Sequence, residues 1–498
     1  MATEVQIDER AREWVGHEHP MLIGENWVPA ASGKTFQTFN PATGEVLAHV
    51  AAGDSEDIDR AVKTARVALE SGPWSRMKAN ERGRAIHRLG DLILEHGDEL
   101  AALETLDNGK PLAIARAADV ELAADQFHYM SGWATKLEGN TIPISVPYMP
   151  DAQFHAYTLR EPVGVVGQII PWNFPLLMAA WKLGPALASG VTVVLKPAEQ
   201  TPLSALRLGE LILEAGIPPG VVNIVPGFGE TAGAALAAHP DVDKIAFTGS
   251  TEVGRLIVQA ASGNLKKVSL ELGGKSPNIV FADADLETAI PGAANAIFFN
   301  HGQCCCAGSR LFVDAKIYDE VAQGVTDHAK NLKVGSGLDP QAEMGPLVSQ
   351  EQLDRVCSFL DSGQAEGAET LTGGQRVGDR GYFVAPTVLA NTNPNMKVEA
   401  EEIFGPVVTV APFSDVDEVV SRGNGSNYGL AAGVWTSDVS KAHRVAKSLR
   451  AGTVWINCYN VFDAAMPFGG FKESGWGREM GHEALELYTE VKSVCAQL

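Results

Sequence analysis

Three short motifs place side chains that together suit attack on a carbonyl group. Cys304, Cys305 and Cys306 are consecutive thiols set among small residues, so a substrate can approach them without steric cover. Upstream, Glu271 supplies a carboxylate that can act as a base, and Asn173 supplies an amide that can donate to an oxyanion. The combination predicts a thiol nucleophile that acts on a carbonyl compound.

The cysteine usage excludes a disulfide framework and indicates a reducing compartment. Half of the 6 cysteines are consecutive, and no Cys-x-x-Cys spacing occurs. Adjacent side chains cannot readily converge on one zinc ion, so we expect no metal site.

Composition places the chain among globular proteins of the cytoplasm. Its 498 residues are too many for one ordinary core, so two or three domains are expected. The formal net charge of -22 disfavours binding to nucleic acid or to anionic lipid. The N-terminal residues show no signal or transit pattern, and no window approaches the roughly 18 apolar residues of a membrane span.

Regular alternation of short apolar strands and helices after residue 163 predicts a parallel sheet. The expected strands span 163–170, 191–195, 221–225, 244–248 and 267–272, and the helices between them span 175–189, 202–215, 231–238 and 251–261. Such alternation builds a doubly wound α/β fold of the nucleotide-binding type. A second α/β series follows residue 274, with strands at 277–281 and 310–313 and helices at 286–299 and 315–332.

Other regions have a different character. Residues 54–136 follow helical spacing, whereas residues 140–160 are extended and broken by proline, which predicts an edge strand or an arm that leaves the body. The tail at 491–495 is short and rich in β-formers. We expect it to pair with an edge strand of this or of another subunit.

The turn at 247–254 lies where a predicted strand gives way to a helix. Gly249 allows close approach of a ligand to the backbone, and Ser250 and Thr251 begin a helix whose N–H groups can hold a pyrophosphate. An ordinary helix cap explains this turn equally well when it is considered alone.

Lys196 and Glu199 follow another predicted strand, at the end where α/β folds bind ligands. Glu199 can accept hydrogen bonds from both ribose hydroxyls, which favours NAD and disfavours a 2′-phosphate. The alternative is an exposed ion pair. A Gly-x-Gly-x-x-Ala string that contains Gly229 resembles a dinucleotide fingerprint, but a lone string of this kind is weak evidence.

Seven motifs, in their order and spacing, resemble those of the aldehyde dehydrogenase superfamily, and the resemblance covers nearly the whole chain. They span 171–175, 196–199, 247–254, 271–275, 302–310, 402–406 and 467–470.

The resemblance implies an α/β fold with a Rossmann-like NAD-binding domain, an α/β catalytic domain and a β-strand oligomerisation arm. The implied bounds are 1–140 and 161–273 for the NAD-binding domain, 274–480 for the catalytic domain, and 141–160 and 481–498 for the arm. It also implies a homotetramer built as a dimer of dimers, or a homodimer, in which arm strands extend a partner's sheet.

The resemblance also assigns roles to individual residues. Cys305 is implied as the nucleophile, Asn173 and the backbone N–H of Cys305 as oxyanion donors, and Glu271 as the general base. Lys182 and Glu479 match a pair that relays protons away from that base. The implied NAD contacts are Trp172, Lys196, Glu199, Gly229, Phe247, Gly249, Ser250, Val253, Glu402 and Phe404. Glu230 departs from the family pattern, in which proline often stands beside the adenine.

The implied reaction is NAD-dependent oxidation of an aldehyde to the carboxylic acid through a thiohemiacetal and a thioester. A free thiol has a pKa of about 8.5, so Cys305 needs activation, either by Glu271 through a water molecule or by the positive nicotinamide and nearby helix ends. The presence of Glu271 favours hydrolysis of the thioester over its transfer to coenzyme A. A catalytically silent NAD-binding relative is the alternative outside enzymes, and such a protein would have lost the thiol or the base.

The resemblance implies a substrate tunnel lined by Phe174, Trp181, Phe462 and Phe468. An aromatic lining without a placed cation suits an apolar or aromatic aldehyde and argues against succinic semialdehyde. Stretches at 356–361 and 492–495 look similar to bacterial phenylacetaldehyde dehydrogenases of styrene breakdown, which makes phenylacetaldehyde the specific prediction. The alternative is a broad aliphatic aldehyde or semialdehyde dehydrogenase.

Overall fold

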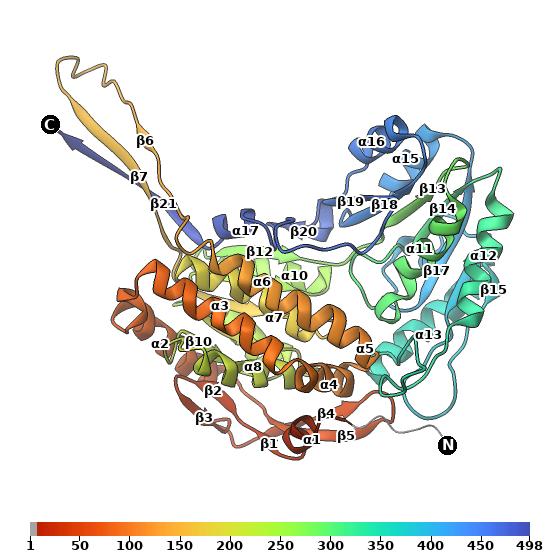
Figure 1. The fold of residues 1–498 in the computed structure, drawn as a ribbon, viewed down its shortest axis with the longest axis horizontal. Coiled ribbons are helices and arrows are strands. Elements are labelled where there is room, and N and C mark those ends of the chain that lie inside the picture. The colour runs from red at the N-terminus through yellow and green to blue at the C-terminus, as the bar shows by residue number, and fades with distance from the viewer. Residues whose placement is uncertain (1–6) are drawn as a thin grey trace.

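The structure, a computed structural model, describes residues 7–498 and contains two large sheets and a projecting β-ribbon (Figure 1). The sequence predicts no signal or transit peptide at the N-terminus. Residues 1–6, on which this prediction falls, lie outside the part of the chain that the structure describes. Among the described helices, none is long and apolar enough to cross a membrane.

The first sheet has eight strands in the order β20-β12-β11-β8-β9-β10-β2-β3, and its five central strands run parallel. These central strands are β8 (Val165–Ile169), β9 (Thr192–Lys196), β10 (Val222–Ile224), β11 (Lys244–Thr248) and β12 (Lys267–Glu271). The edge strands β20 (Gly475–Trp476), β2 (Met21–Ile23) and β3 (Asn26–Val28) are antiparallel to their neighbours. The chain proceeds from β8 to β10 on one side and then continues at β11 on the other, so a ligand site is expected between the ends of β8 and β11.

Helices on both faces bury the apolar runs of this sheet, as a parallel sheet requires. They include α2 (Ser55–Glu70), α7 (Pro175–Ser189), α8 (Leu203–Glu214) and α10 (Thr251–Ala261). The predicted helical region 54–136 is a series of separate helices, of which the longer ones are α2, α3 (Ala79–Glu95), α4 (Gly97–Asn108) and α6 (Glu121–Ser131). The helix predicted at 231–238 begins as a π-helical turn, Gly229–Gly233, and continues as α9 (Ala234–Ala238).

The second sheet has seven strands in the order β15-β16-β17-β14-β13-β18-β19, and only β15 is antiparallel. The strands are β13 (Pro277–Val280), β14 (Arg310–Asp314), β15 (Glu369–Thr372), β16 (Thr387–Ala390), β17 (Val407–Phe413), β18 (Ala431–Trp435) and β19 (Thr453–Ile456). The helices packed on it include α11 (Leu286–Phe298), α12 (Tyr318–Asn331), α13 (Gln350–Ala365), α15 (Val416–Asn424) and α16 (Val439–Ser448).

The ribbon consists of β6 (Thr141–Ile142), β7 (Phe154–Pro162) and β21 (Thr489–Gln497), and Figure 1 shows it extending away from the body. The C-terminal tail pairs with β7 of its own chain, from Thr489 opposite Pro162 to Gln497 opposite Phe154. The predicted pairing of the tail with an edge strand is therefore satisfied within the chain. A further three-stranded sheet contains β1 (Glu18–His19), β5 (Glu45–Ala51) and β4 (Thr35–Asn40).

Candidate active site

The carboxyl ends of β8, β11 and β12 face the cysteine triplet across one cavity of about 750 Å³. The first sheet contributes the loops that follow these strands, and the second part of the chain contributes the triplet after α11 and the short helix η4 (Phe299–Gly302). The cavity brings together twelve of the predicted site residues: Trp172, Asn173, Phe174, Trp181, Gly249, Ser250, Glu271, Cys305, Glu402, Phe404, Phe462 and Phe468. Predicted residues outside its lining are Lys182, Lys196, Glu199, Gly229, Phe247, Val253 and Glu479.

A strained turn presents the triplet to this cavity. Asn300 and His301 have left-handed backbone angles, with φ of 47° and 59°, and Gly302 follows with φ of 69°. A side chain at Gly302 would place its Cβ 2.0 Å from the carbonyl oxygen of Gly405. Left-handed conformations in residues other than glycine persist only where surrounding contacts over-determine them, and they cluster at functional sites.

Cys305 is the only thiol of the triplet that is partly exposed, whereas Cys304 and Cys306 are buried. The sulfur atoms of those two neighbours lie 3.4 Å apart. Contact with the thiols of Cys304 and Cys306, together with burial, holds the pKa of Cys305 well above its ordinary value. Geometry therefore favours Cys305 as the reactive thiol, and the raised pKa means that it needs activation.

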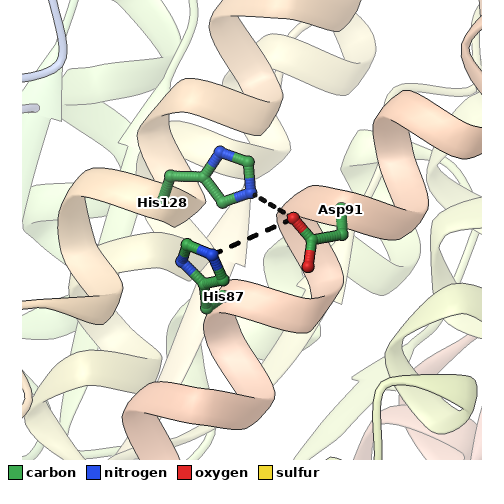
Figure 2. Close-up of side chains that lie close together, drawn as sticks. All are labelled: His87, Asp91 and His128. Carbon is green, nitrogen blue, oxygen red and sulfur yellow. Dashed lines mark hydrogen bonds and ion pairs between the residues drawn. The ribbon is translucent and has the colours of Figure 1, made fainter.

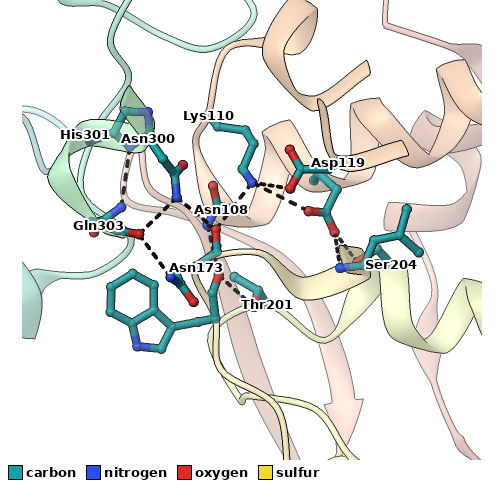
Figure 3. Close-up of polar contacts among 12 residues, drawn as sticks. Asn108, Lys110, Asp119, Asn173, Thr201, Ser204, Asn300, His301 and Gln303 are labelled. Carbon is teal, nitrogen blue, oxygen red and sulfur yellow. Dashed lines mark hydrogen bonds and ion pairs between the residues drawn. The ribbon is translucent and has the colours of Figure 1, made fainter. Parts of the chain in front are cut away.

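Asn173 is fixed by hydrogen bonds to both its side chain and its backbone (Figure 3). Its Nδ2 donates to the carbonyl oxygen of Gln303 over 3.0 Å. Its own carbonyl oxygen accepts from Asn300 Nδ2 at 3.0 Å, from Lys110 Nζ at 3.3 Å and from Asn108 Nδ2 at 3.4 Å. The amide is thus held directly beside the cysteine loop by residues that the sequence did not single out.

Lys110 belongs to a buried network of charged groups behind this amide. Its Nζ lies 2.7 Å from Asp119 Oδ1, 3.9 Å from Glu104 Oε2 and 4.2 Å from the ring centre of Phe174. Burial raises the pKa of Glu104 to about 7 and also raises the pKa of Asp119. Lys110 therefore holds together two buried carboxyl groups, the backbone of Asn173 and one aromatic wall of the cavity.

We predict that Lys110→Met destabilises the fold by about 3–5 kcal/mol, because removal of one partner leaves buried acidic groups uncompensated. A shift of the urea midpoint to lower concentration measures the loss. Lys63→Met is the matched control, since Lys63 and its partner Asp59 are largely exposed and such pairs contribute little. Equal stability of the two variants would contradict this account of the network.

Glu271 ends β12 and is buried at 3% exposure. Burial, reinforced by the nearby charge of Glu479, raises its pKa well above the ordinary value. Its Oε1 has no hydrogen-bond partner among the described residues, which leaves that atom available to a ligand or water. The predicted relay pair lies close by and is itself paired, with Lys182 Nζ 2.5 Å from Glu479 Oε1 and 2.7 Å from Thr248 Oγ1.

Several of the predicted NAD contacts lie around the start of α10 and the end of β9. Ser250 caps α10 by accepting from the backbone N–H of Val253 over 3.2 Å, so the helix cap considered from the sequence is present. Lys196 Nζ lies 3.0 Å from Glu199 Oε2, but Lys196 is 2% exposed, so the pair is not an exposed one. Glu199 also lines a separate hollow of about 510 Å³, beside Phe228.

Gly229, Gly249 and Val253 are three more of the predicted NAD contacts, and they differ in how open their surroundings are. A Cβ at Gly229 would meet nothing within 4 Å, and one at Gly249 would lie 2.5 Å from the ring of Phe247. Val253 is 41% exposed on α10. The backbone at Gly229 is therefore free of covering side chains, which is what close approach of a phosphate group needs, whereas the Phe247 ring fills the space beside Gly249.

Glu402 and Phe404 border the cavity from the second part of the chain. Glu402 Oε1 accepts from the backbone N–H of Gly274 over 2.8 Å, and burial raises its pKa to about 7. Phe404 has φ of 61° and lies edge-on to Trp172, with ring centres 5.2 Å apart. Two residues missed by the sequence analysis hold this segment: Arg355 donates to the Glu402 carbonyl and Gln352 to that of Phe404.

Aromatic side chains form the apolar end of the cavity. Trp181, Phe462 and Phe468 pack against one another with ring centres 5.4–6.0 Å apart. Phe174 is stacked on Phe299, which the sequence analysis did not predict. Other lining residues that it missed are Ala118, Leu122, Leu177, Met178 and Asn460.

A doubly wound sheet whose strand ends face an accessible thiol, a buried carboxylate and a side-chain amide defines a thiol-dependent dehydrogenase. Residues 27–494 match the aldehyde dehydrogenase family, and the chain belongs to this family. It is 55% identical over 494 residues to "Putative aldehyde dehydrogenase DhaS" of Bacillus subtilis, with 99% of each chain covered. It is also 55% identical to the human "Aldehyde dehydrogenase, mitochondrial", covering 96% of this chain and 92% of that protein.

Among solved structures, the NAD+ complex of the aldehyde dehydrogenase from Bacillus cereus superposes with a TM-score of 0.97 at 53% identity, and each chain is fully covered. The predicted fold class is thereby confirmed. The predicted enzyme class, an NAD-dependent aldehyde dehydrogenase, is confirmed as well. None of these three relatives is named for phenylacetaldehyde.

Proposed function

We propose that this chain oxidises apolar aldehydes to carboxylic acids with NAD+, through a thioester on Cys305. One observation carries the assignment of the residues. The only partly exposed thiol of the triplet shares a single cavity with Asn173 and with Glu271. In this assignment Cys305 is the nucleophile, Asn173 the oxyanion donor and Glu271 the base for hydrolysis.

The reaction begins when the Cys305 thiol gives up its proton to solvent, which the positive nicotinamide ring of bound NAD+ would favour; the sulfur then adds to the carbonyl carbon and the aldehyde oxygen becomes an oxyanion. Asn173 Nδ2 carries a second hydrogen beyond the one donated to Gln303, and that hydrogen stabilises the oxyanion. Bound NAD+ supplies the hydride acceptor. The resulting thioester is attacked by a water molecule whose proton passes to Glu271, and the acid and free thiol are released.

The Lys182–Glu479 pair, which lies near Glu271, takes that proton away from it. Lys182 and Glu479 are joined over 2.5 Å, and the charge of Glu479 acts on the pKa of Glu271. Such a pair can pass a proton onward with little motion of its own heavy atoms. Glu271 is then free to accept another proton in the next turnover.

The residues that surround the cavity and its approach fit a dinucleotide. The start of α10 offers backbone N–H groups for phosphate, and Lys196 and Glu199 stand at the end of β9, where a ribose would lie. Glu402 and the Trp172–Phe404 pair line the part of the cavity toward the thiol. We assign these residues, with Gly229, Phe247, Gly249, Ser250 and Val253, to the cofactor.

The lining favours a broad range of apolar aldehydes over phenylacetaldehyde alone. Trp181, Phe462 and Phe468 present hydrocarbon surface to the substrate, and such surface discriminates between apolar groups only weakly. The relatives at 55% identity are named as aldehyde dehydrogenases without a single substrate, which supports the same choice. Phenylacetaldehyde remains one expected substrate, because its ring can stack on these aromatic walls.

We predict that hexanal and phenylacetaldehyde have kcat/KM values within about 100-fold of one another, because an apolar pocket discriminates between apolar groups only weakly, by roughly 10–200-fold for one methylene. NADH formation with a panel of acetaldehyde, hexanal, benzaldehyde and phenylacetaldehyde measures this. Succinic semialdehyde serves as the charged control and should be much poorer. A preference for phenylacetaldehyde far beyond that span would contradict a broad substrate range and would support a dehydrogenase specific for phenylacetaldehyde.

The proposal extends to assembly and organisation. The ribbon exposes Ile142, Leu159 and Val491, which supports its assignment, as residues 141–160 and 481–498, to an oligomerisation arm of a homotetramer or homodimer. Residues 1–140 and 161–273 are assigned to the NAD-binding domain, and residues 274–480 to the catalytic domain. A cytoplasmic location is part of the same proposal.

A further inference from the structure

We propose that His87, Asp91 and His128 form a binding site for a divalent transition-metal ion, on the surface between α3 and α6 (Figure 2). None of the three lines the cavity of the active site. The proposal is therefore independent of the aldehyde dehydrogenase reaction, and it replaces the expectation of no metal site that came from the cysteines alone.

The three side chains converge from two helices. His87 and Asp91 are one turn apart on α3 and so share a face of that helix, and His128 faces them from α6. His128 Nε2 lies 3.0 Å from Asp91 Oδ1, and His87 Nε2 lies 4.0 Å from the same oxygen. All candidate ligand atoms lie within 4.8 Å of one another, so small side-chain rotations bring them to one ion.

The hydrogen bonds around His87 leave a lone pair aimed at the carboxylate. Ser131 Oγ donates its only hydrogen to the backbone oxygen of His128 over 2.6 Å. Toward His87 Nδ1, at 3.4 Å, the same oxygen must then accept, so in the neutral ring the proton sits on Nδ1 and Nε2 carries the lone pair. Two acceptor atoms, His87 Nε2 and Asp91 Oδ1, face each other at 4.0 Å, which is too long for a hydrogen bond. A divalent cation bound here replaces the proton that joins His128 Nε2 to Asp91 Oδ1 at 3.0 Å and releases it to solvent.

Two glycines of α3 create the close approach that the site needs. A Cβ at Gly90 would lie 2.5–2.6 Å from the ring atoms of His128, and a Cβ at Gly83 would lie 2.7 Å from the backbone oxygen of Ser131. Both positions face α6. Without side chains there, α6 packs closely enough for His128 and Ser131 to reach the face that carries His87 and Asp91.

The donor set selects the kind of metal. Two imidazoles and one carboxylate suit zinc, cobalt, nickel or copper, whereas calcium and magnesium prefer oxygen ligands alone. A surface hollow of about 380 Å³ beside these side chains leaves room for water or a small anion as a further ligand. Arg84 and Arg88 line that hollow; Arg88 is paired with Glu95 over 2.6 Å, and Arg84 favours an anionic fourth ligand.

Titration of the full-length protein with Co²⁺ tests the proposal, because the visible spectrum of Co²⁺ reports its ligands. Unbound Co²⁺ has only very weak visible bands, which ligation by histidine nitrogen shifts and intensifies, whereas a thiolate adds an intense near-ultraviolet band, so the free ion, the proposed site and the cysteines are told apart. We expect one Co²⁺ per chain with nitrogen and oxygen bands only. His87→Ala, Asp91→Asn and His128→Ala should each weaken binding by at least about 10-fold.

His443→Ala is the matched control, since His443 is an exposed histidine on another helix, α16, and this variant should bind Co²⁺ normally. NADH formation by the three site variants should stay near that of the unchanged protein, which excludes misfolding as the cause of lost binding. Absence of the visible bands, their persistence in His128→Ala, or a thiolate band as the only signal would each overturn the proposal.

Discussion

Cys305→Ala is expected to lower NADH formation by at least about 10⁴-fold with every aldehyde, because loss of a covalent nucleophile removes the acylation step itself. Binding of NAD+ should be unchanged, because Cys305 is assigned to the substrate and not to the cofactor. The quenching of tryptophan fluorescence on addition of NAD+ measures this binding. The pairing of lost turnover with intact cofactor binding is the signature of a missing nucleophile.

Cys304→Ala and Cys306→Ala are the matched controls for this prediction. Both thiols border the cavity but are buried, at 6% and 1% exposure, so they present less surface to a substrate than Cys305 does. Each variant should keep a substantial part of the turnover, reduced only by repacking around the 3.4 Å contact between the two sulfur atoms. Near-normal turnover of Cys305→Ala, or complete loss in a folded Cys304→Ala, would show that the nucleophile has been misassigned.

Glu271→Gln is expected to separate the two halves of the reaction. The amide cannot accept a proton from water, so hydrolysis of the thioester should slow by about 10²–10⁴-fold, the contribution typical of a general base. Acylation does not need that base in our proposal. Rapid mixing with aldehyde and NAD+ should therefore give a burst of NADH close to one per active site, followed by very slow turnover.

The same residue predicts the pH dependence of the unchanged enzyme. Only deprotonated Glu271 can act as a base, and burial holds its pKa well above the ordinary value, so steady-state turnover should rise with pH through that raised pKa. This rising limb should disappear in Glu271→Gln. Loss of the burst in the variant would mean instead that Glu271 acts before acylation, as the group that activates the thiol.

Much of the fold follows from patterns visible in the sequence. The apolar run at 163–170 appears as β8 (Val165–Ile169), and the runs at 191–195 and 244–248 appear as β9 and β11 with bounds shifted by at most one residue. Such runs are readable because strands buried on both faces of a parallel sheet are apolar throughout. The prediction is poorer at 229–233, where a π-helical turn that begins and ends with glycine precedes α9.

The site was predictable where its residues sit at strand ends and not where they are held by distant contacts. Asn173 and Ser250 follow parallel strands and Glu271 is the last residue of another, so their proximity is a property of the fold. Asn108, the last residue of α4, and Lys110, in the loop that follows, lie more than sixty residues earlier in the chain and reach the same site through hydrogen bonds to the Asn173 backbone. No local sequence pattern predicts a contact of that kind.

The central claim, a covalent thioester on Cys305, is tested most directly by mass spectrometry of Glu271→Gln after rapid mixing with hexanal and NAD+. The account predicts that the acyl group accumulates on the chain as NADH forms, and that fragmentation of the peptide spanning 302–310 places the added mass on Cys305. Formation of NADH without an adduct, or an adduct on Cys304 or Cys306, would contradict it.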